Sequence, residues 1–131
     1  AIGQPDEKAG EMPCAYVELN VGASVTVAEL IEFSKANVPE RAARPKYIEI
    51  LDELPKTAVG KIFKPQLRKL AIKRIYDEKL LADGLDVTVK EVLEDKKRGL
   101  TAHLNKPRSN IEDELIKNSL GDFIRPWAWA E

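Results

Sequence analysis

The sequence predicts a mixed fold of the α/β or α+β class, in which strand-like and helix-like stretches follow one another along 131 residues. In residues 14–19 and 47–51, apolar side chains recur at every second position, which is the spacing of a strand. In residues 26–38 and 65–79, apolar side chains recur three and four positions apart, which is the spacing of a helix with one buried face.

Composition favours one compact, soluble domain, with 44% hydrophobic residues, 33% charged residues and a formal net charge of -1. No apolar run approaches the roughly 18 residues of a membrane span, and no signal-peptide pattern begins the chain. Cys14 has no partner for an internal disulfide, so we expect a small buried side chain. These features predict a cytoplasmic protein. Because the chain begins with Ala1 and not with Met, we also expect a fragment of a longer protein.

The first third of the chain predicts a strand, a helix and a second strand. Residues 1–3 suggest the end of a strand, residues 5–11 a polar connection, and residues 14–19 a strand. Thr26 and Glu29 have the spacing of a capping box at a helix start, and Pro39 ends that helix. Its apolar face, expected to cover a sheet, consists of Val27, Leu30, Ile31 and Val38. A short crossing at 40–45 with two arginines leads to the strand at 47–51.

A loop at residues 55–64 separates that strand from the next helix. Pro65 suits the first helical turn, where its missing N–H costs nothing. We expect Leu67, Leu70, Ala71 and Ile75 to face inward and Arg68, Lys69, Lys73 and Arg74 to face largely outward.

Beyond Lys79 the pattern predicts a hairpin followed by a helix. After a turn at Asp83-Gly84, we expect one strand face at Val87, Val89, Glu91 and Leu93, a turn at 95–99, and a second face at Leu100, Ala102 and Leu104. Ser109 and Glu112 suggest another capping box, followed by a helical stripe of Ile111, Leu115, Ile116 and Leu120 that Gly121 closes. The tail at 123–131 holds both tryptophans. We expect the tail to dock on the domain, with a partner surface or disorder as alternatives.

The loop at 55–64 is the strongest candidate for chemistry. Seven Lys or Arg residues and no Asp or Glu lie between Lys56 and Arg74, and Gly60 directly precedes Lys61. A lysine ammonium on a flexible loop suits a phosphate or a carboxylate, although charge alone favours a solvated basic surface made of Lys56, Lys61 and Lys64. With a single histidine, His103, and a single thiol, we expect no metal site. There is no phosphate-cradling loop motif and no aromatic stacking set for nucleic acid.

Two motifs carry a resemblance to a known family. These are Gly3-Gln4-Pro5-Asp6 with Gly10-Glu11, and the stretch 54–62 (Leu-Pro-Lys-Thr-Ala-Val-Gly-Lys-Ile) with Leu67-Arg68 beyond it. Over about residues 1–73 the chain resembles the small C-terminal domain of the adenylate-forming enzymes, and residues 10–19 resemble the fatty-acyl-CoA synthetase branch. The resemblance implies an α+β fold with a small mixed sheet flanked by helices. Residues 1–79 would be the C-terminal lid domain, and residues 80–131 a hairpin-plus-helix extension packed on it or contacting another subunit.

The resemblance also implies a site. Lys61 would reach into a large N-terminal domain and assist acyl-adenylate formation, with Thr57 and Gly60 shaping its loop. A candidate surface for phosphate, CoA or the large domain consists of Lys56, Lys64, Arg68 and Lys69. The implied substrates are a carboxylic acid, fatty in this branch, with ATP, its Mg2+ and CoA, all held mainly by the absent domain. The domain alone would then be inert. A domain that loads a carrier-protein thiol and a free-standing interaction module are the alternatives.

Overall fold

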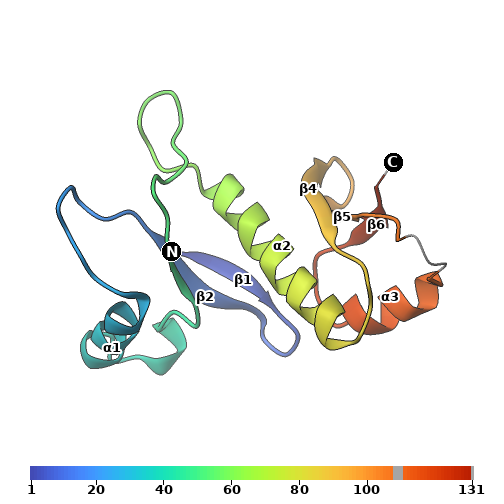
Figure 1. Ribbon diagram of the computed structural model, residues 1–131, viewed down its shortest axis with the longest axis horizontal. Helices are drawn as coiled ribbons and strands as arrows, with labels where there is room; N and C mark the ends of the chain where they lie inside the picture. The colour runs from blue at the N-terminus through green and yellow to red at the C-terminus, as the bar shows by residue number, and fades with distance from the viewer. Residues whose placement is uncertain (108–110, 131) are drawn as a thin grey trace. The chain divides into compact units, whose positions relative to one another are not determined.

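The computed structural model describes residues 1–107 and 111–130 and has the predicted α+β architecture (Figure 1). Its strands are β1 (Ile2–Asp6), β2 (Gly10–Val17), β3 (Ile48–Ile50), β4 (Val89–Asp95), β5 (Gly99–Leu104) and β6 (Trp127–Trp129). Its helices are α1 (Val27–Asn37), a short 3-10 turn at Arg41–Ala43, α2 (Lys64–Ala82) and α3 (Asp113–Leu120). The chain divides into two compact units. Unit 1 comprises Ala1–Gln4 and Glu11–Arg68, and unit 2 comprises Pro5–Gly10 and Lys69–Glu131.

The first sheet has the order β1-β2-β3, with β2 and β3 parallel and Tyr16 opposite Glu49. The polar connection expected at 5–11 is shorter than predicted, because β1 continues to Asp6 and β2 already begins at Gly10. The Asp6 carboxylate accepts hydrogen bonds from the N–H groups of Lys8 and Ala9, and Gly10 adopts a φ of 83°. The Asp6 side chain closes the turn and Gly10 adopts the left-handed conformation, so the two strands are joined by a tight hairpin and not by a loose connection.

Helix α1 follows its sequence signals closely. The Thr26 hydroxyl caps the helix by accepting from the N–H of Glu29 at 3.1 Å, and the helix ends before Val38-Pro39. In a full capping box the Glu29 side chain would accept from the Thr26 backbone N–H. Here the Glu29 carboxylate accepts from the Thr26 hydroxyl instead. The helix lies beside β3, as expected of a helix that covers a sheet. Its one buried residue is Ser34, whose hydroxyl donates to the Ile31 carbonyl.

Helix α2 begins in unit 1 and ends in unit 2, with Pro65 in its first turn as predicted. Leu67 and Ala71 are buried, but the inward position predicted for Leu70 is wrong, since 37% of that residue is exposed. In unit 2 the buried stripe consists of Ile72, Tyr76 and Leu80 at i, i+4 and i+8. Leu70 does not belong to this stripe, so its apolar side chain was a poor guide to which face of the helix is buried.

The second sheet has the order β4-β5-β6 and belongs to unit 2. The hairpin turn is as predicted, because Asp95 accepts from the N–H groups of Lys97 and Arg98 and Gly99 has a φ of 76°. The alternation predicted through β4 is wrong beyond Val89. The register shifts between Val89 and Glu91, so Lys90 is an extra residue, Val92 is buried and Leu93 is 42% exposed. One inserted residue moves every following side chain to the opposite face.

The C-terminal helix and strand complete unit 2. Glu112 is the N-cap of α3 and makes no side-chain cap bond, so it does not occupy the third helical position that the second capping box requires, and Ser109 lies outside the described residues. Ile116 and Leu120 are buried as predicted, whereas Leu115 is 48% exposed. The tryptophan tail docks on its own domain as strand β6, parallel to β5.

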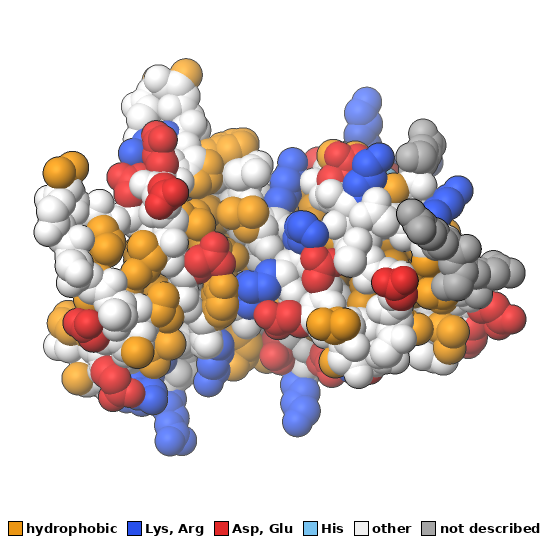
Figure 2. Space-filling model, in the orientation of Figure 1, with side chains coloured by type: hydrophobic (Ala, Val, Ile, Leu, Met, Phe, Trp, Pro, Cys, Tyr) orange, Lys and Arg blue, Asp and Glu red, His pale blue; other side chains and the backbone are white. Residues whose placement is uncertain are grey.

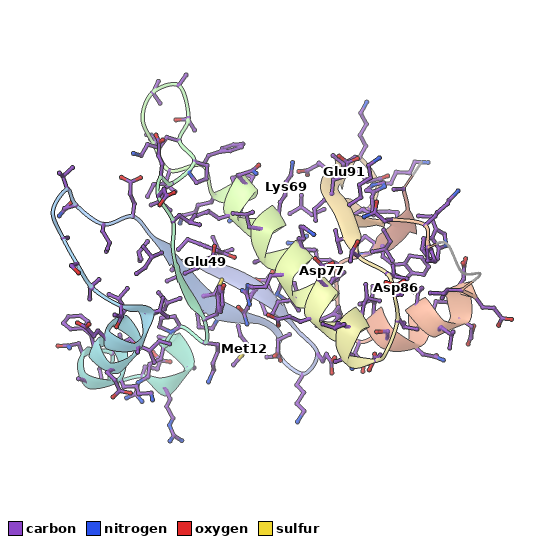
Figure 3. The ribbon with its side chains drawn as sticks, viewed as in Figure 1. Met12, Glu49, Lys69, Asp77, Asp86 and Glu91 are labelled. Carbon is purple, nitrogen blue, oxygen red and sulfur yellow. The ribbon has the colours of Figure 1, made fainter. Side chains whose placement is uncertain are left out.

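The core of unit 2 surrounds the aromatic ring of Tyr76. This ring stacks on Phe123 with centroids 4.9 Å apart, and its hydroxyl donates to the Arg125 carbonyl at 2.6 Å. Burial raises the pKa of the Tyr76 phenol. Asp77, which projects from α2 in Figure 3, accepts from the Val89 N–H at 2.7 Å and from the Lys73 ammonium. These bonds attach β4 and the C-terminal segment to the helix.

Candidate active-site loop and cationic cleft

The lysine loop, residues 55–63, is a small hairpin-like turn between β3 and α2 (Figure 1). Lys56 and Ile62 form an antiparallel bridge, and the Phe63 N–H donates to the Pro55 carbonyl at 2.8 Å. The Thr57 N–H donates to the Lys61 carbonyl at 2.7 Å. The backbone of the loop is therefore hydrogen-bonded to itself on both sides of its tip.

Lys61 lies just after the tip, on an exposed stretch of backbone. Its N–H donates to the Thr57 hydroxyl at 3.2 Å, and the Gly60 N–H donates to the Thr57 carbonyl at 2.9 Å. Gly60 has a φ of 85°, a conformation that side-chain-bearing residues rarely adopt. The Thr57 side chain and the left-handed glycine thus fix the backbone of Lys61 while its side chain extends into solvent.

Apolar side chains flank this lysine. Val59 is 80% exposed, Ile62 is 49% exposed and Phe63 is 45% exposed. Figure 2 shows hydrophobic atoms at the tip of the loop. A lysine framed by exposed apolar residues suits a site from which water is excluded when another surface covers the loop.

Glu18, which belongs to no motif in the sequence, lies at the base of the loop. One carboxylate oxygen accepts from the Leu54 N–H at 2.7 Å and lies 3.6 Å from the Lys56 ammonium. The Leu54 hydrogen bond, together with the Lys56 charge, holds the pKa of the Glu18 carboxyl below its usual value. Figure 2 shows acidic and basic side chains next to each other at this base.

The other predicted site residues do not all join the loop. Lys64 is the first residue of α2, and Arg68 follows one turn later at i+4, so the two exposed side chains share a helix face in unit 1. Lys69, labelled in Figure 3, is half-buried and belongs to unit 2. The structure thus gathers Lys56, Thr57, Gly60 and Lys61, and leaves Lys64 and Arg68 on the adjoining helix.

Unit 1 also contains a cationic cleft of about 610 Å³. Its lining consists of Ile31, Ser34, Lys35, Arg41, Arg44, Pro45 and Lys46. Arg44 is half-buried and donates to the Val38 carbonyl at 2.7 Å, and Lys35 pairs with Glu32. The sequence showed two arginines in this crossing, but only the packing of the crossing beside α1 shows that they line one cleft. Four cations in one hollow suit an anionic ligand.

Within residues 1–107 and 111–130, no three His, Cys, Asp or Glu side chains gather in a way that could hold a metal ion. His103 lies in β5, opposite Glu91 on one side and Ala128 on the other. None of the described helices is both long enough and apolar enough to cross a membrane.

The fold and the lysine loop coincide with a known domain class. Residues 1–61, which include the whole tip of the loop, match the family model of the AMP-binding enzyme C-terminal domain. Over these residues the match confirms the resemblance predicted from the sequence.

Individual relatives sharpen this assignment. The chain is 37% identical over 122 residues to a marinolic acid–CoA ligase of Pseudoalteromonas sp. (strain SANK 73390), a match that covers 92% of this chain and 18% of the relative. It is 44% identical over 72 residues to probable acyl-activating enzyme 8 of Arabidopsis thaliana, covering 53% of this chain and 13% of that protein. It is 40% identical over 72 residues to a 2-methylpropanoate–CoA ligase of Humulus lupulus, with the same coverage of 53% and 13%.

The chain therefore spans less than a fifth of the length of these relatives. The 122 matched residues of the bacterial ligase exceed the 79 residues of the expected lid domain. Similarity to that protein must then extend into residues 80–131, whereas the plant relatives match only about half of the chain.

Proposed function

We propose that this chain is the mobile C-terminal domain of an AMP-forming acyl-CoA ligase and supplies the lysine for its adenylation step. The family match and the names of the relatives support the class of reaction. The observation that carries the residue assignment is the exposed Lys61 on a loop whose backbone is fixed by Thr57 and Gly60. Such a loop can deliver a positive charge to a partner surface.

The proposed reaction has two half-reactions. The substrate carboxylate attacks the α-phosphorus of ATP, forming an acyl-adenylate and releasing pyrophosphate. The CoA thiol then attacks the acyl carbon, forming the thioester and releasing AMP and a proton. Charge builds on the oxygens of the transferring phosphorus in the first step, so a positioned ammonium such as that of Lys61 stabilises its transition state. A large N-terminal domain would bind the acid, the ATP with its Mg2+ and the CoA.

The second half-reaction needs a different surface. In the proposed cycle the domain rotates between the two steps, removing Lys61 and presenting another face to CoA. The cationic cleft lined by Arg41, Arg44 and Lys46 supports this proposal, because CoA carries phosphate groups and the cleft supplies positive charge. Lys64 and Arg68 offer further positive charge on α2.

The decisive test is Lys61→Ala in the full-length enzyme. Formation of acyl-adenylate should slow by about 10²–10³, the usual loss when one preorganised charge-stabilising group is removed. Thioester formation from supplied acyl-adenylate should change by less than about threefold, because Lys61 acts before CoA. Rates are measured by pyrophosphate release and by thioester appearance.

Controls separate this role from simple charge loss. Lys61→Arg should not restore full activity, because a planar guanidinium does not replace a point charge. Lys96→Ala removes another exposed lysine, in the β4–β5 turn, and should leave both half-reactions intact. Equal losses in both half-reactions of Lys61→Ala would refute the assignment.

Two alternatives remain testable. If the acyl acceptor is a carrier-protein thiol, the full-length enzyme will transfer acyl groups to that protein and not to CoA. If the 131 residues are a free-standing module, the reading frame will begin at this domain.

The isolated domain is expected to be inert. If the 131 residues by themselves catalyse exchange between ATP and pyrophosphate, that expectation is wrong. Cytoplasmic location is part of the proposal, and fractionation tests it, since one relative is named a peroxisomal acyl-activating enzyme.

A further inference from the structure

We infer that Glu18 is a positioning residue for Lys61, a role that rests on the proposed function of the lysine loop. Glu18 follows directly on the last residue of β2 and lies 36 residues before Leu54 in the chain. It is therefore a long-range contact between the sheet of unit 1 and the segment that leads into the loop.

The sheet brings Glu18 to the start of the loop. Strands β2 and β3 run parallel, and the last residues paired between them are Val17 and Ile50. Just after β3, the Leu51 N–H donates to the Val17 carbonyl at 2.8 Å. Position 18 thus lies at the edge of the sheet where the chain leaves β3. Three residues further along, the Glu18 carboxylate accepts the Leu54 N–H at 2.7 Å.

The hydrogen bonds within the loop fix its shape but not its direction. The bonds between Thr57, Gly60 and Lys61, and the bridge between Lys56 and Ile62, all join loop residues to one another. None of these bonds connects the base of the loop to the sheet. Glu18 acts at that base, because the same carboxylate oxygen holds the Leu54 backbone and lies 3.6 Å from the Lys56 ammonium.

The hydrogen bond to Leu54 is the stronger part of this clamp. The side chains of Lys56 and Glu18 are 41% and 32% exposed, so water and salt screen their attraction. A short bond from a backbone N–H to a carboxylate is directional and charge-assisted. It restrains the backbone at Leu54. Lys61 lies seven residues after Leu54, within the hydrogen-bonded turn of the loop.

Catalysis is sensitive to this kind of restraint. A displacement of about 1 Å in a catalytic group can cost about 10²-fold in rate. If Glu18 orients the loop, its loss should reduce the adenylation rate through Lys61 alone. Glu18 itself touches no reacting atom in this arrangement.

The experiment compares Glu18→Met with Glu18→Gln in the full-length enzyme. Methionine keeps the length of the side chain but cannot accept the Leu54 N–H, whereas the glutamine amide oxygen can. We expect Glu18→Met to slow acyl-adenylate formation by about 10–100-fold and Glu18→Gln by less than about threefold. Thioester formation from supplied acyl-adenylate should stay within about twofold for both. Glu53→Met makes the same change one residue before Leu54 and should leave both half-reactions unchanged.

A double variant separates positioning from general damage. If Glu18 acts through Lys61, adding Glu18→Met to Lys61→Ala should cause no further loss of adenylation. Additive losses, or equal losses in both half-reactions, would overturn the inference.

The two proposals fail differently. Full adenylation activity in Glu18→Met, with a slow Lys61→Ala, would refute the positioning role and leave the role of Lys61 intact. Full adenylation activity in Lys61→Ala would refute the proposed function first. If Glu18→Met does not fold, Glu18→Gln with the charge-reversing Glu18→Lys replaces it, and equal adenylation rates in those two variants refute the inference.

Discussion

The two units of this chain are built in different ways. Among its described residues, unit 2 has a continuous core of eleven buried side chains, drawn from α2, both hairpin strands, α3 and the segment between α2 and β4. In unit 1 the buried apolar residues are Ile2, Cys14, Tyr16, Ile48 and Leu67. The candidate catalytic lysine belongs to unit 1. Its loop is held by polar groups of Glu18 and Thr57.

This difference suggests that the two units have different local stabilities. Segments with few buried contacts open more readily than densely packed cores. The chain provides a natural probe for each unit. Both tryptophans, Trp127 and Trp129, lie in β6 of unit 2, and the single cysteine, Cys14, is fully buried in β2 of unit 1.

The largest effect is expected in the core of unit 2. Leu80 is completely buried among Tyr76 and its neighbours, and Leu80→Ala should lower the free energy of unfolding by about 2–5 kcal/mol. Urea unfolding followed by tryptophan fluorescence measures this change. Leu81→Ala, at a residue 77% exposed, is the matched control and should change it by less than about 0.5 kcal/mol. A similar loss in both variants would remove the distinction between core and surface on which the comparison depends.

A smaller effect is expected in unit 1. Thr26 caps α1 through the Glu29 N–H, and Thr26→Ala should cost about 1 kcal/mol. A loss of about 1 kcal/mol raises the equilibrium constant for opening of unit 1 about fivefold. Labelling of Cys14 by a thiol reagent should therefore become about fivefold faster. Tryptophan fluorescence should report an unchanged urea midpoint. If both probes shift together, the units unfold as one and the comparison fails.

The smallest effect is a pH dependence confined to unit 2. Hydrogen bonds from the Lys97 and Arg98 N–H groups hold the pKa of Asp95 below its usual value. A carboxyl whose folded pKa is depressed stabilises the protein above its unfolded pKa, about 3.9, and loses that contribution as the pH falls through the folded value. Asp95→Asn should therefore lower the urea midpoint at pH 7, and the difference from the natural chain should shrink below about pH 4. A difference that stays constant with pH would contradict this origin.

Sequence patterns predicted most elements because each depends on neighbouring residues. The Thr26 cap, Pro65 at the start of α2 and the turn closed by Gly99 all follow from local chemistry. The irregularity at Lys90 was not predictable in this way, because no glycine or proline marks it and it is defined by the partner strand β5. The resulting error reversed the expected faces of Val92 and Leu93.

Part of the candidate site was also predictable from neighbouring residues, and part was not. Lys61 and Gly60 belong to a short motif, so the resemblance found them. Glu18 occupies an exposed position after a strand, and its bond to Leu54 exists only once β2 and β3 have paired. The cationic cleft likewise needs α1 and the following crossing to come together.

Strand β6 has a consequence for the order in which the molecule can form during translation. It pairs with β5 in parallel, and the Ala130 N–H donates to the Leu104 carbonyl at 2.7 Å, so the second sheet remains two-stranded until residues 127–130 have been synthesised. Unit 1 contains no residue beyond Arg68. Domains generally fold from the N-terminus as they emerge from the ribosome. The lysine loop can therefore take shape on a nascent chain whose most densely packed region is still missing its last strand.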